Sequence, residues 1–262
     1  MGGFLVINPR SGQGAKTDLL RSEAARLGIE THVLGEHESP AEVAQRAPHE
    51  PLGMAGGDGS LSAVAEVAIE RGAPFVVVPF GGFNHFARDL GLDRRDPVAA
   101  LEAFTGREQS VDVARVNGRL FLNNLSLGLY ARLVQRSEGG DSLARVKALA
   151  LLLRNPSGLG VTVDGRNVHA RVVVVSNNHY RLDALRLGER DRLDEGVLYL
   201  YVAHGWLPST WEERPLRSFT VDARAGRLEA AIDGEATELE TPLRLEVEPR
   251  ALRVLLPRAP VG

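Results

Sequence analysis

The chain has 262 residues, of which 44% are hydrophobic and 25% charged, with a net charge of −3 at pH 7. These values are typical of a globular protein of one or two domains, and the acidic balance with only 5% aromatic residues argues against a nucleic-acid partner. The absence of cysteine excludes disulfides, thiolate metal sites and a cysteine nucleophile. No apolar run approaches the ~18 residues that span a bilayer, and the start lacks a signal sequence, so we expect a cytoplasmic protein, at most peripheral to a membrane.

The first hundred residues alternate short apolar runs with helical patterns. The predicted strands are 4–7, 29–34, 52–55 and 75–78, and the predicted helices are 15–27, 40–47, one that follows Ser60 and one that begins near His85. Ser60 is the candidate N-cap of the third helix, and Gly72 is its candidate C-cap. Repeated strand–loop–helix units predict an α/β domain with a parallel sheet.

Beyond Asp112 the chain is richer in short β-like runs, several of them separated by Asn-Gly or Asp-Gly turns. The predicted strands are 111–116, 120–123, 160–163, 170–176, 197–203, 218–223, 228–232, 243–247 and 252–256. One helix is predicted at 142–154. This pattern indicates a second, mostly antiparallel β domain.

Three glycine-rich loops follow predicted strands of the first domain: 8–14, 56–60 and 81–84. The carboxyl ends of parallel strands meet at one edge of a sheet, where open α/β folds bind ligands. Glycine lets the backbone approach a phosphate, and Asp58 among the glycines suits a Mg²⁺ ion beside a polyphosphate. Any one loop alone is typical of a tight turn, but three together favour nucleotide binding. The chain has no Walker A loop and matches the dinucleotide fingerprint poorly.

The motifs resemble those of the diacylglycerol kinase catalytic-domain family, bacterial lipid kinases related to sphingosine kinase and more remotely to NAD kinase. The matching segments, in chain order, are Asn8-Pro9-Arg10-Ser11-Gly12-Gln13-Gly14, Gly56-Gly57-Asp58-Gly59-Ser60-Leu61, residues 79–91, Val111-Asp112-Val113, residues 192–198, Asp233-Gly234-Glu235 and residues 251–255. The resemblance implies an ATP-binding domain at 1–113, to which 250–262 return. It also implies a β-sandwich-like lipid domain at 114–249, with a cleft between the two. The implied reaction is Mg²⁺-dependent transfer of the γ-phosphate of ATP to a hydroxyl of a diacylglycerol-like or sphingoid lipid.

The resemblance also implies roles for individual residues. Asp58 and Asp112 match positions linked to the catalytic Mg²⁺, and the carbonyls of Arg192 and Val197 with the Glu195 carboxylate match a second Mg²⁺ site. A charged surface turn is the equal alternative for that segment. Glu235 is the favoured general base, with Asp233 a near-equal candidate, and an ordinary hairpin turn is the alternative for both. The residues implied in nucleotide binding are Asn8, Pro9, Arg10, Ser11, Gly12, Gly56, Gly57, Asp58, Gly59, Ser60, Ser62, Gly81, Gly82 and Asn84.

Some positions depart from the family pattern. Gly82 stands where Thr is usual, His85 where Asp is common, Ser62 where Asn is common, and Leu34 roughly where some members have a Thr. Because of the departure at Gly82, a non-catalytic nucleotide-binding sensor remains an alternative function. A soluble-substrate kinase of the NAD kinase type is the other alternative.

The predicted helix at 142–154 has an apolar face of Leu143, Val146, Ala150 and Leu153, with basic residues around it. Such a helix can lie on an anionic membrane, although packing in the core is the favoured interpretation. Two-fold dimers are the commonest soluble assemblies, which leaves a homodimer open.

Overall fold

The computed structural model of the chain describes residues 2–11, 14–128, 159–170, 172–181, 188–203 and 211–258. It divides into two compact units, Met1–Val111 with Arg250–Gly262, and Asp112–Pro249. The predicted helix at 142–154, with its basic and apolar faces, lies outside the described residues, and so does Gly12 of the first glycine-rich loop.

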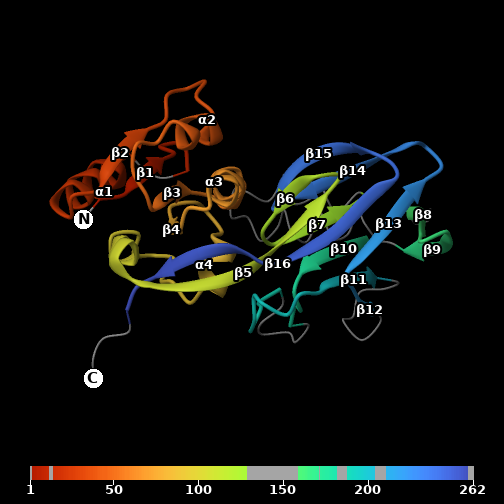
Figure 1. Ribbon diagram of the computed structural model, residues 1–262. Coiled ribbons are helices and arrows are strands. Elements are labelled where there is room, and N and C mark those ends of the chain that lie inside the picture. Colours follow the sequence, from red (N-terminus) through yellow and green to blue (C-terminus); the bar gives the residue numbers. More distant parts are fainter. Residues whose placement is uncertain are drawn as a thin grey trace. The chain divides into compact units, whose positions relative to one another are not determined.

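The N-terminal unit contains a parallel sheet with the strand order β2-β1-β3-β4-β16 (Figure 1). Its strands are β1 (Phe4–Ile7), β2 (Glu30–Val33), β3 (Leu52–Gly56), β4 (Phe75–Pro79) and the end of β16 (Leu243–Leu256). Every residue of β1, β3 and β4 is buried, because helices cover both faces of the sheet. The parallel sheet predicted from the strand–loop–helix pattern is therefore confirmed.

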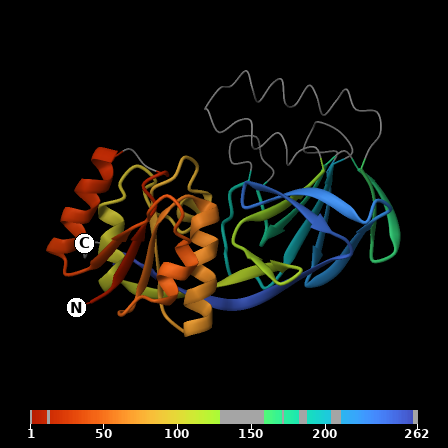
Figure 2. The same cartoon turned by 90° about the horizontal axis from the view of Figure 1, so that it is seen from above.

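Helices of this unit lie on opposite faces of the sheet, with α1 on one side and α3 on the other (Figure 2). They are α1 (Gly14–Arg26), α2 (Pro40–Gln45), α3 (Asp58–Arg71), α4 (His85–Asp89) and the 3-10 helix η1 (Ala99–Thr105). Leu20 of α1 and Leu101 of η1 share an apolar cluster with Leu5 and Ile7 of β1. Packing of this kind is what stabilises short helices in a domain.

The ends of α3 test two cap predictions. Gly72 ends the helix in the left-handed conformation, with a φ of 62°, as predicted. The prediction that Ser60 is the N-cap is wrong, because the helix begins at Asp58 and Gly57 is the N-cap. Ser60 lies inside the first turn, where its hydroxyl is available to another loop.

The second unit is a sandwich of two antiparallel sheets, which confirms the predicted fold class. One sheet has the order β12-β11-β10-β7-β14-β15, and the other contains β16, β13, β8 and β9, with β5 on β16 and β6 on β5. Val173 and Val175 from the first sheet share one core with Phe219 and Val221 from the second. The strands are β5 (Arg107–Val116), β6 (Arg119–Phe121), β7 (Asn124–Leu127), β8 (Leu159–Val163), β9 (Arg166–Ala170), β10 (Val172–Asn177), β11 (Leu198–Ala203), β12 (Trp211–Leu216), β13 (Ser218–Ala223), β14 (Arg227–Ile232) and β15 (Glu235–Glu240).

Strand β16 differs from the prediction. The two predicted strands at 243–247 and 252–256 form one strand of 14 residues that continues through Pro249. Its first part pairs antiparallel with β13, and its last part pairs parallel with β4. Strands β7, β9, β12 and β15 have no counterpart among the predicted strands.

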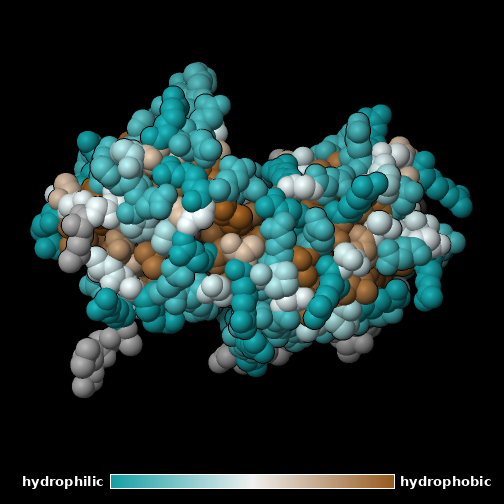
Figure 3. Space-filling model, in the orientation of Figure 1, coloured by the Kyte–Doolittle hydropathy of each residue, from teal (hydrophilic) through white to brown (hydrophobic). Residues whose placement is uncertain are grey.

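Few large apolar side chains are exposed in the part of the chain that the structure describes. Among the described residues, Leu19 and Leu27 are the exposed large hydrophobic residues, and the face in Figure 3 is mostly hydrophilic. Within the same part of the chain, no helix is long and apolar enough to cross a bilayer.

Candidate functional site

Three glycine-rich loops meet at the carboxyl edge of the N-terminal sheet, because they follow the neighbouring parallel strands β1, β3 and β4. The Asn8 side-chain amide donates to Ser60 Oγ at 3.1 Å, which links the first loop to the second. The second and third loops touch through backbone, since a Cβ atom at Gly81 would lie 2.5 Å from Gly57 Cα. Backbones that approach this closely fit the requirements of a phosphate-binding site.

Asp58 anchors the third loop from the second. Asp58 is 9% exposed; its Oδ2 accepts the His85 N–H at 3.2 Å, and its Oδ1 accepts the Phe86 N–H at 3.1 Å. A negative charge at the first N–H groups of α4 is favourable. The structure therefore gives the predicted metal residue a definite position beside the glycine-rich loops.

Asn84 and Ser62 use their side chains within the loops and helices that carry them. Asn84 Oδ1 accepts the Gly81 N–H at 2.9 Å, and its Nδ2 donates to the Gly81 carbonyl at 2.8 Å. Asn84 has a φ of 51°, a left-handed conformation that asparagine tolerates. Ser62 Oγ donates to the Asp58 carbonyl at 3.1 Å, one turn earlier in α3. Both residues thus shape the site, and Asn84 in particular holds Gly81 in place.

The first loop is ordered by Asn8. Its Oδ1 accepts the Arg10 N–H at 3.1 Å, and the Arg10 guanidinium donates to the Glu36 carbonyl at 2.6 Å. Asn8 is buried, Pro9 and Ser11 are partly buried, and Arg10 is exposed. The described part of the loop therefore buries Asn8 and exposes Arg10 at the sheet edge.

A pocket of about 330 Å³ opens at this edge, between the first and third loops. It contains three cationic side chains, Lys16, Arg94 and Arg95, which the motifs did not single out. Lys16 could have been found from its place in the first helical turn after the loop. Arg94 and Arg95 could not, because only the fold brings their segment to the first loop. The lining residues are Ser11, Lys16, Pro79, Phe80, Gly81, Arg94, Arg95 and Pro97.

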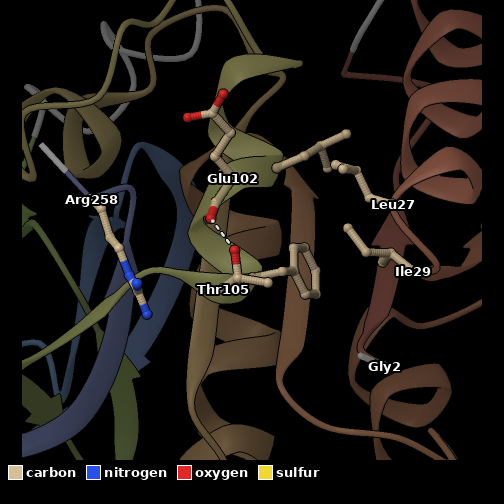
Figure 4. A pocket seen from close by; sticks show the side chains of 8 residues that line it. Gly2, Leu27, Ile29, Glu102, Thr105 and Arg258 are labelled. Carbon is tan, nitrogen blue, oxygen red and sulfur yellow. Dashed lines mark hydrogen bonds between the residues drawn. The ribbon is translucent and has the colours of Figure 1, made fainter. Parts of the chain in front are cut away.

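A larger pocket of about 450 Å³ lies elsewhere in the unit (Figure 4). Leu27 and Ile29 line one side of it, and Arg258 lies on the other. Gly2 and Ile29 precede β1 and β2, so this pocket is at the amino edge of the parallel sheet. Ligands of such sheets bind at the carboxyl edge, which makes the smaller pocket the candidate site despite its size.

The second unit brings Asp112 together with the turn at 192–197. Asp112 is 1% exposed; its N–H donates to the Leu193 carbonyl at 2.7 Å, and its Oδ2 accepts the Gly196 N–H at 2.6 Å. The Asn177 side-chain amide donates to the Asp112 carbonyl at 2.9 Å. Asp112 and the turn at 192–197, singled out by separate motifs, are thus neighbours within the second unit.

Glu195 and Val197 are held by the segment that follows β10. Glu195 Oε2 accepts the His179 N–H at 3.0 Å, and the Val197 carbonyl accepts the Asn178 N–H at 3.0 Å. Carboxylate and carbonyl oxygens are the donor types that Mg²⁺ prefers, and Asp112, Glu195 and Val197 supply them. In the described part of the chain no three acidic or histidine side chains converge as a metal site. The Arg192 side chain forms an ion pair with Asp194 at 2.9 Å. The group of Arg192 that was predicted as a metal ligand is its backbone carbonyl.

Asp233 and Glu235 occupy the hairpin between β14 and β15 but differ in their surroundings. Asp233 is 8% exposed; its Oδ1 accepts the N–H groups of Asn123 and Asn124 at 2.7 and 3.1 Å. Its Oδ2 accepts the Leu122 N–H at 2.8 Å. The Glu235 side chain is 60% exposed, with Arg119 at 3.9 Å. Asp233 thus supports the neighbouring backbone, whereas Glu235 faces solvent.

Arg190 is a buried residue of this region that the motifs did not single out. It is 4% exposed, and its guanidinium donates to the carbonyls of Leu122 and Asn177 at 2.7 and 3.0 Å. It also donates to Asn123 Oδ1 at 2.7 Å. Arg190 and Asp233 therefore hold the same segment, residues 122–124. Arg190 donates to its oxygen atoms, and Asp233 accepts from its backbone N–H groups.

Residues 3–116 match the model of the diacylglycerol kinase catalytic domain. The N-terminal unit is therefore similar to a diacylglycerol kinase catalytic domain. The resemblance inferred from the motifs is thereby confirmed, and the three glycine-rich loops lie within the matched diacylglycerol kinase segment.

Relatives and solved structures cover the rest of the chain. A Klebsiella pneumoniae protein named "Probable lipid kinase YegS-like" is 27% identical over 97% of this chain and 95% of its own. A Pseudomonas aeruginosa protein of the same name is 36% identical, over 44% of this chain and 37% of its own. The crystal structure of a diacylglycerol kinase from Bacillus anthracis has a TM-score of 0.70 at 19% identity, covering 97% of this chain and 96% of that one. This likeness shows that the two-unit diacylglycerol kinase fold extends along the chain.

Proposed function

We propose that the chain is a Mg²⁺-dependent lipid kinase that transfers the γ-phosphate of ATP to a hydroxyl of a diacylglycerol-like or sphingoid lipid. The observation that carries this proposal is the meeting of three glycine-rich loops around the buried Asp58 carboxylate, at one edge of a sheet. Phosphoryl transfer depends on positioning and charge stabilisation rather than on covalent chemistry by the protein. An edge built from backbone and small residues supports that kind of catalysis.

The N-terminal unit would bind the nucleotide. Gly57 and Gly81 allow the phosphates to approach the backbone, and Asn84 keeps Gly81 in the conformation that permits it. Asp58 and Asp112, together with Glu195 and the carbonyls of Arg192 and Val197, are the oxygen donors that we propose for Mg²⁺. When bound, Mg²⁺ neutralises phosphate charge that the carboxylates alone would repel.

Glu235 is the proposed general base, with Asp233 in a positioning role. A base must reach the hydroxyl whose proton it takes. The Asp233 oxygens already accept three backbone N–H groups, while the Glu235 side chain is exposed at the start of β15. Contact with the membrane surface belongs to the same proposal, because the acceptor is a lipid.

The test is transfer of radiolabelled γ-phosphate from ATP to a panel of acceptors, with and without Mg²⁺. The lipids are diacylglycerol, monoacylglycerol, ceramide, sphingosine and phosphatidylglycerol in mixed micelles, and NAD is the soluble acceptor. We expect one labelled lipid class in the presence of Mg²⁺. In Glu235→Gln we expect turnover to fall about 10²- to 10⁴-fold while ATP affinity is kept.

Other outcomes would overturn the proposal in different ways. Labelled NAD without labelled lipid would favour a kinase with a soluble substrate. Measurable ATP binding with no labelled acceptor would favour a nucleotide-binding sensor, the reading that the missing side chain at Gly82 supports. Full activity of Glu235→Gln would remove Glu235 as the base.

A further inference from the structure

We infer that Lys16, Arg94 and Arg95 form a cationic subsite that binds the phosphate chain of the donor nucleotide. The inference deepens the proposed function and rests on it for the identity of the donor. Its basis is the pocket of about 330 Å³ at the carboxyl edge of the N-terminal sheet, which all three side chains line.

The pocket shares residues with two of the three glycine-rich loops. Ser11 lines it from the first loop, and Gly81 lines it from the third, directly after β4. Lys16 enters from the first turn of α1, while Arg94 and Arg95 enter from the segment between α4 and η1. Two separate segments thus direct positive charge to the place where the first and third glycine-rich loops meet.

The charge in this pocket is one-sided. None of the described residues that line it is acidic, in a chain whose net charge is −3. The nearby Asp93 and Asp96 carboxylates accept the N–H groups of Arg95 and Ala99, each at 2.9 Å. These two carboxylates stabilise the loop backbone, and no ion pair joins them to the cations within the described residues. Clustered like charges without counter-charges indicate a site for an anion.

Lys16 breaks a local rule of helix stability. It lies in the first turn of α1, which has no acidic residue. A cation at the positive end of a helix is unfavourable, and negative charge there is favourable. Such departures from local preference are expected at functional positions. The negative charge of a bound phosphate would offset both the partial positive charge at the N-terminus of α1 and the positive charge of Lys16.

Arg94 connects the subsite to the third loop. Its guanidinium donates to the Phe83 carbonyl at 3.0 Å, one residue beyond Gly82. Gly82 has no side chain, and no atom lies within 4 Å of a Cβ built at that position, so the loop is open there. Arg94 supplies a cation beside this gap, and its planar group has further N–H donors for phosphate oxygens. We therefore assign the subsite to the nucleotide rather than to a phosphate of a lipid headgroup.

The test measures binding rather than turnover. Calorimetric titrations of ATP and inorganic tripolyphosphate, with and without Mg²⁺, are made on the full chain and on Lys16→Gln, Arg94→Gln and Arg95→Gln. The matched control is Arg21→Gln, which removes an exposed arginine from α1. Each subsite variant should lose about ten- to a hundredfold in affinity for both ligands, because each loses a charge-assisted hydrogen bond. The control should keep its affinity, and the salt dependence of binding should weaken only in the subsite variants.

The outcomes separate this subsite from the proposed function. Unchanged tripolyphosphate and ATP affinity in all three variants would overturn the subsite, even if lipid phosphorylation is observed. Reduced affinity together with no labelled lipid would support the subsite and remove the lipid kinase function. Vesicles containing phosphatidate test the headgroup alternative: loss of vesicle binding with ATP affinity intact would overturn the nucleotide assignment.

Discussion

The two candidate regions of the molecule are built in opposite ways. At the sheet edge of the N-terminal unit, glycine backbones approach one another and the cations Lys16, Arg94 and Arg95 are exposed. In the second unit, the carboxylates of Asp112 and Asp233 are buried and held by backbone N–H groups. The first region leaves polar and charged groups for a ligand to satisfy. In the second region, the Asp112 and Asp233 carboxylates already accept backbone hydrogen bonds, and the Glu235 side chain is exposed to solvent.

An Asp-Gly pair occurs in both regions, with different consequences. Asp58 begins a helix and accepts two N–H groups of the next one. Asp233 is in a hairpin turn with a φ of 49° and accepts three N–H groups of another strand connection. The same short motif therefore begins a helix in one unit and forms a hairpin turn in the other. Single substitutions in each region test this difference.

The largest effect on stability should come from Asp233→Ala. It removes a buried carboxylate and leaves the N–H groups of Leu122, Asn123 and Asn124 without their acceptor. We expect the free energy of unfolding to fall by about 3–5 kcal/mol, since buried groups that lose a charged partner are costly. Urea denaturation measures this loss. The matched variant Glu235→Gln, on an exposed side chain of the same hairpin, should change it by less than about 0.5 kcal/mol. Equal losses in both variants would contradict the contrast.

A smaller effect is expected from Gly81→Ala at the open edge. The new Cβ would lie 2.5 Å from Gly57 Cα, so the second and third loops must separate. We expect a loss of about 1–3 kcal/mol in stability, as for other overpacked sites, and weaker ATP binding. Gly82→Ala is the control, because no atom lies within 4 Å of a Cβ at that position. If both variants bind ATP equally, the close approach of the loops is not needed for the nucleotide.

Much of the N-terminal unit could be predicted because its local signals agree with its tertiary structure. The apolar run at 4–7 is β1 as predicted, and the runs at 52–55 and 75–78 are β3 and β4, each longer by one residue.

The second unit also contains local signals that the structure confirms. The Asn117-Gly118, Asp164-Gly165 and Asp233-Gly234 turns all have positive φ at both residues and join hairpin strands, as their sequence predicts. In each case a short segment contains the whole signal.

Two of the missed strands, β12 and β15, have sequences that do not look like strands on their own. β15 consists of Glu-Ala-Thr-Glu-Leu-Glu, and β12 contains Glu212, Glu213 and Pro215. Both lie at the edges of the six-stranded sheet, where one side needs no partner and polar residues are tolerated. Pro249 suggests a break in β16 that the pairing on either side overrides. The loop motifs indicated where a site forms, but the contact between the Gly57 and Gly81 backbones and the approach of Arg94 to the first loop depend on the tertiary fold.

Gly82→Thr should produce a gain, and a modest one. The position has open space for a side chain, and threonine is the residue that the motif resemblance leads us to expect there. One added hydrogen bond to a phosphate is worth about 1 kcal/mol, or roughly a fivefold gain in ATP affinity. Calorimetry against ATP measures it, with Gly82→Val as the isosteric control without a hydroxyl. An equal gain in Gly82→Val would show that packing, not a hydrogen bond, is responsible.

The smallest effect concerns an exposed carboxylate that also binds backbone, as Asp233 does when buried. The Gly35 N–H and then the His32 side chain lower the pKa of Glu38 below its usual 4.5. A carboxyl with a lowered pKa in the folded state stabilises the fold above the usual pKa, and this contribution is lost as the pH falls through the folded value. The melting temperature of Glu38→Gln should therefore lie slightly below that of the parent at pH 7, and the difference should narrow as the pH falls below the usual 4.5. A difference that does not change with pH would show that the charge of Glu38 is not the cause.

The course of β16 has a consequence for synthesis of the chain. Strand β4 pairs with β3 on one side, but its other neighbour, the end of β16, is translated only after the whole second unit. While the ribosome makes that unit, β4 is an unprotected sheet edge, a form that promotes misassociation between chains. The unit that emerges first is thus the one completed last, so a premature stop before residue 250 would release a chain with its parallel sheet unfinished.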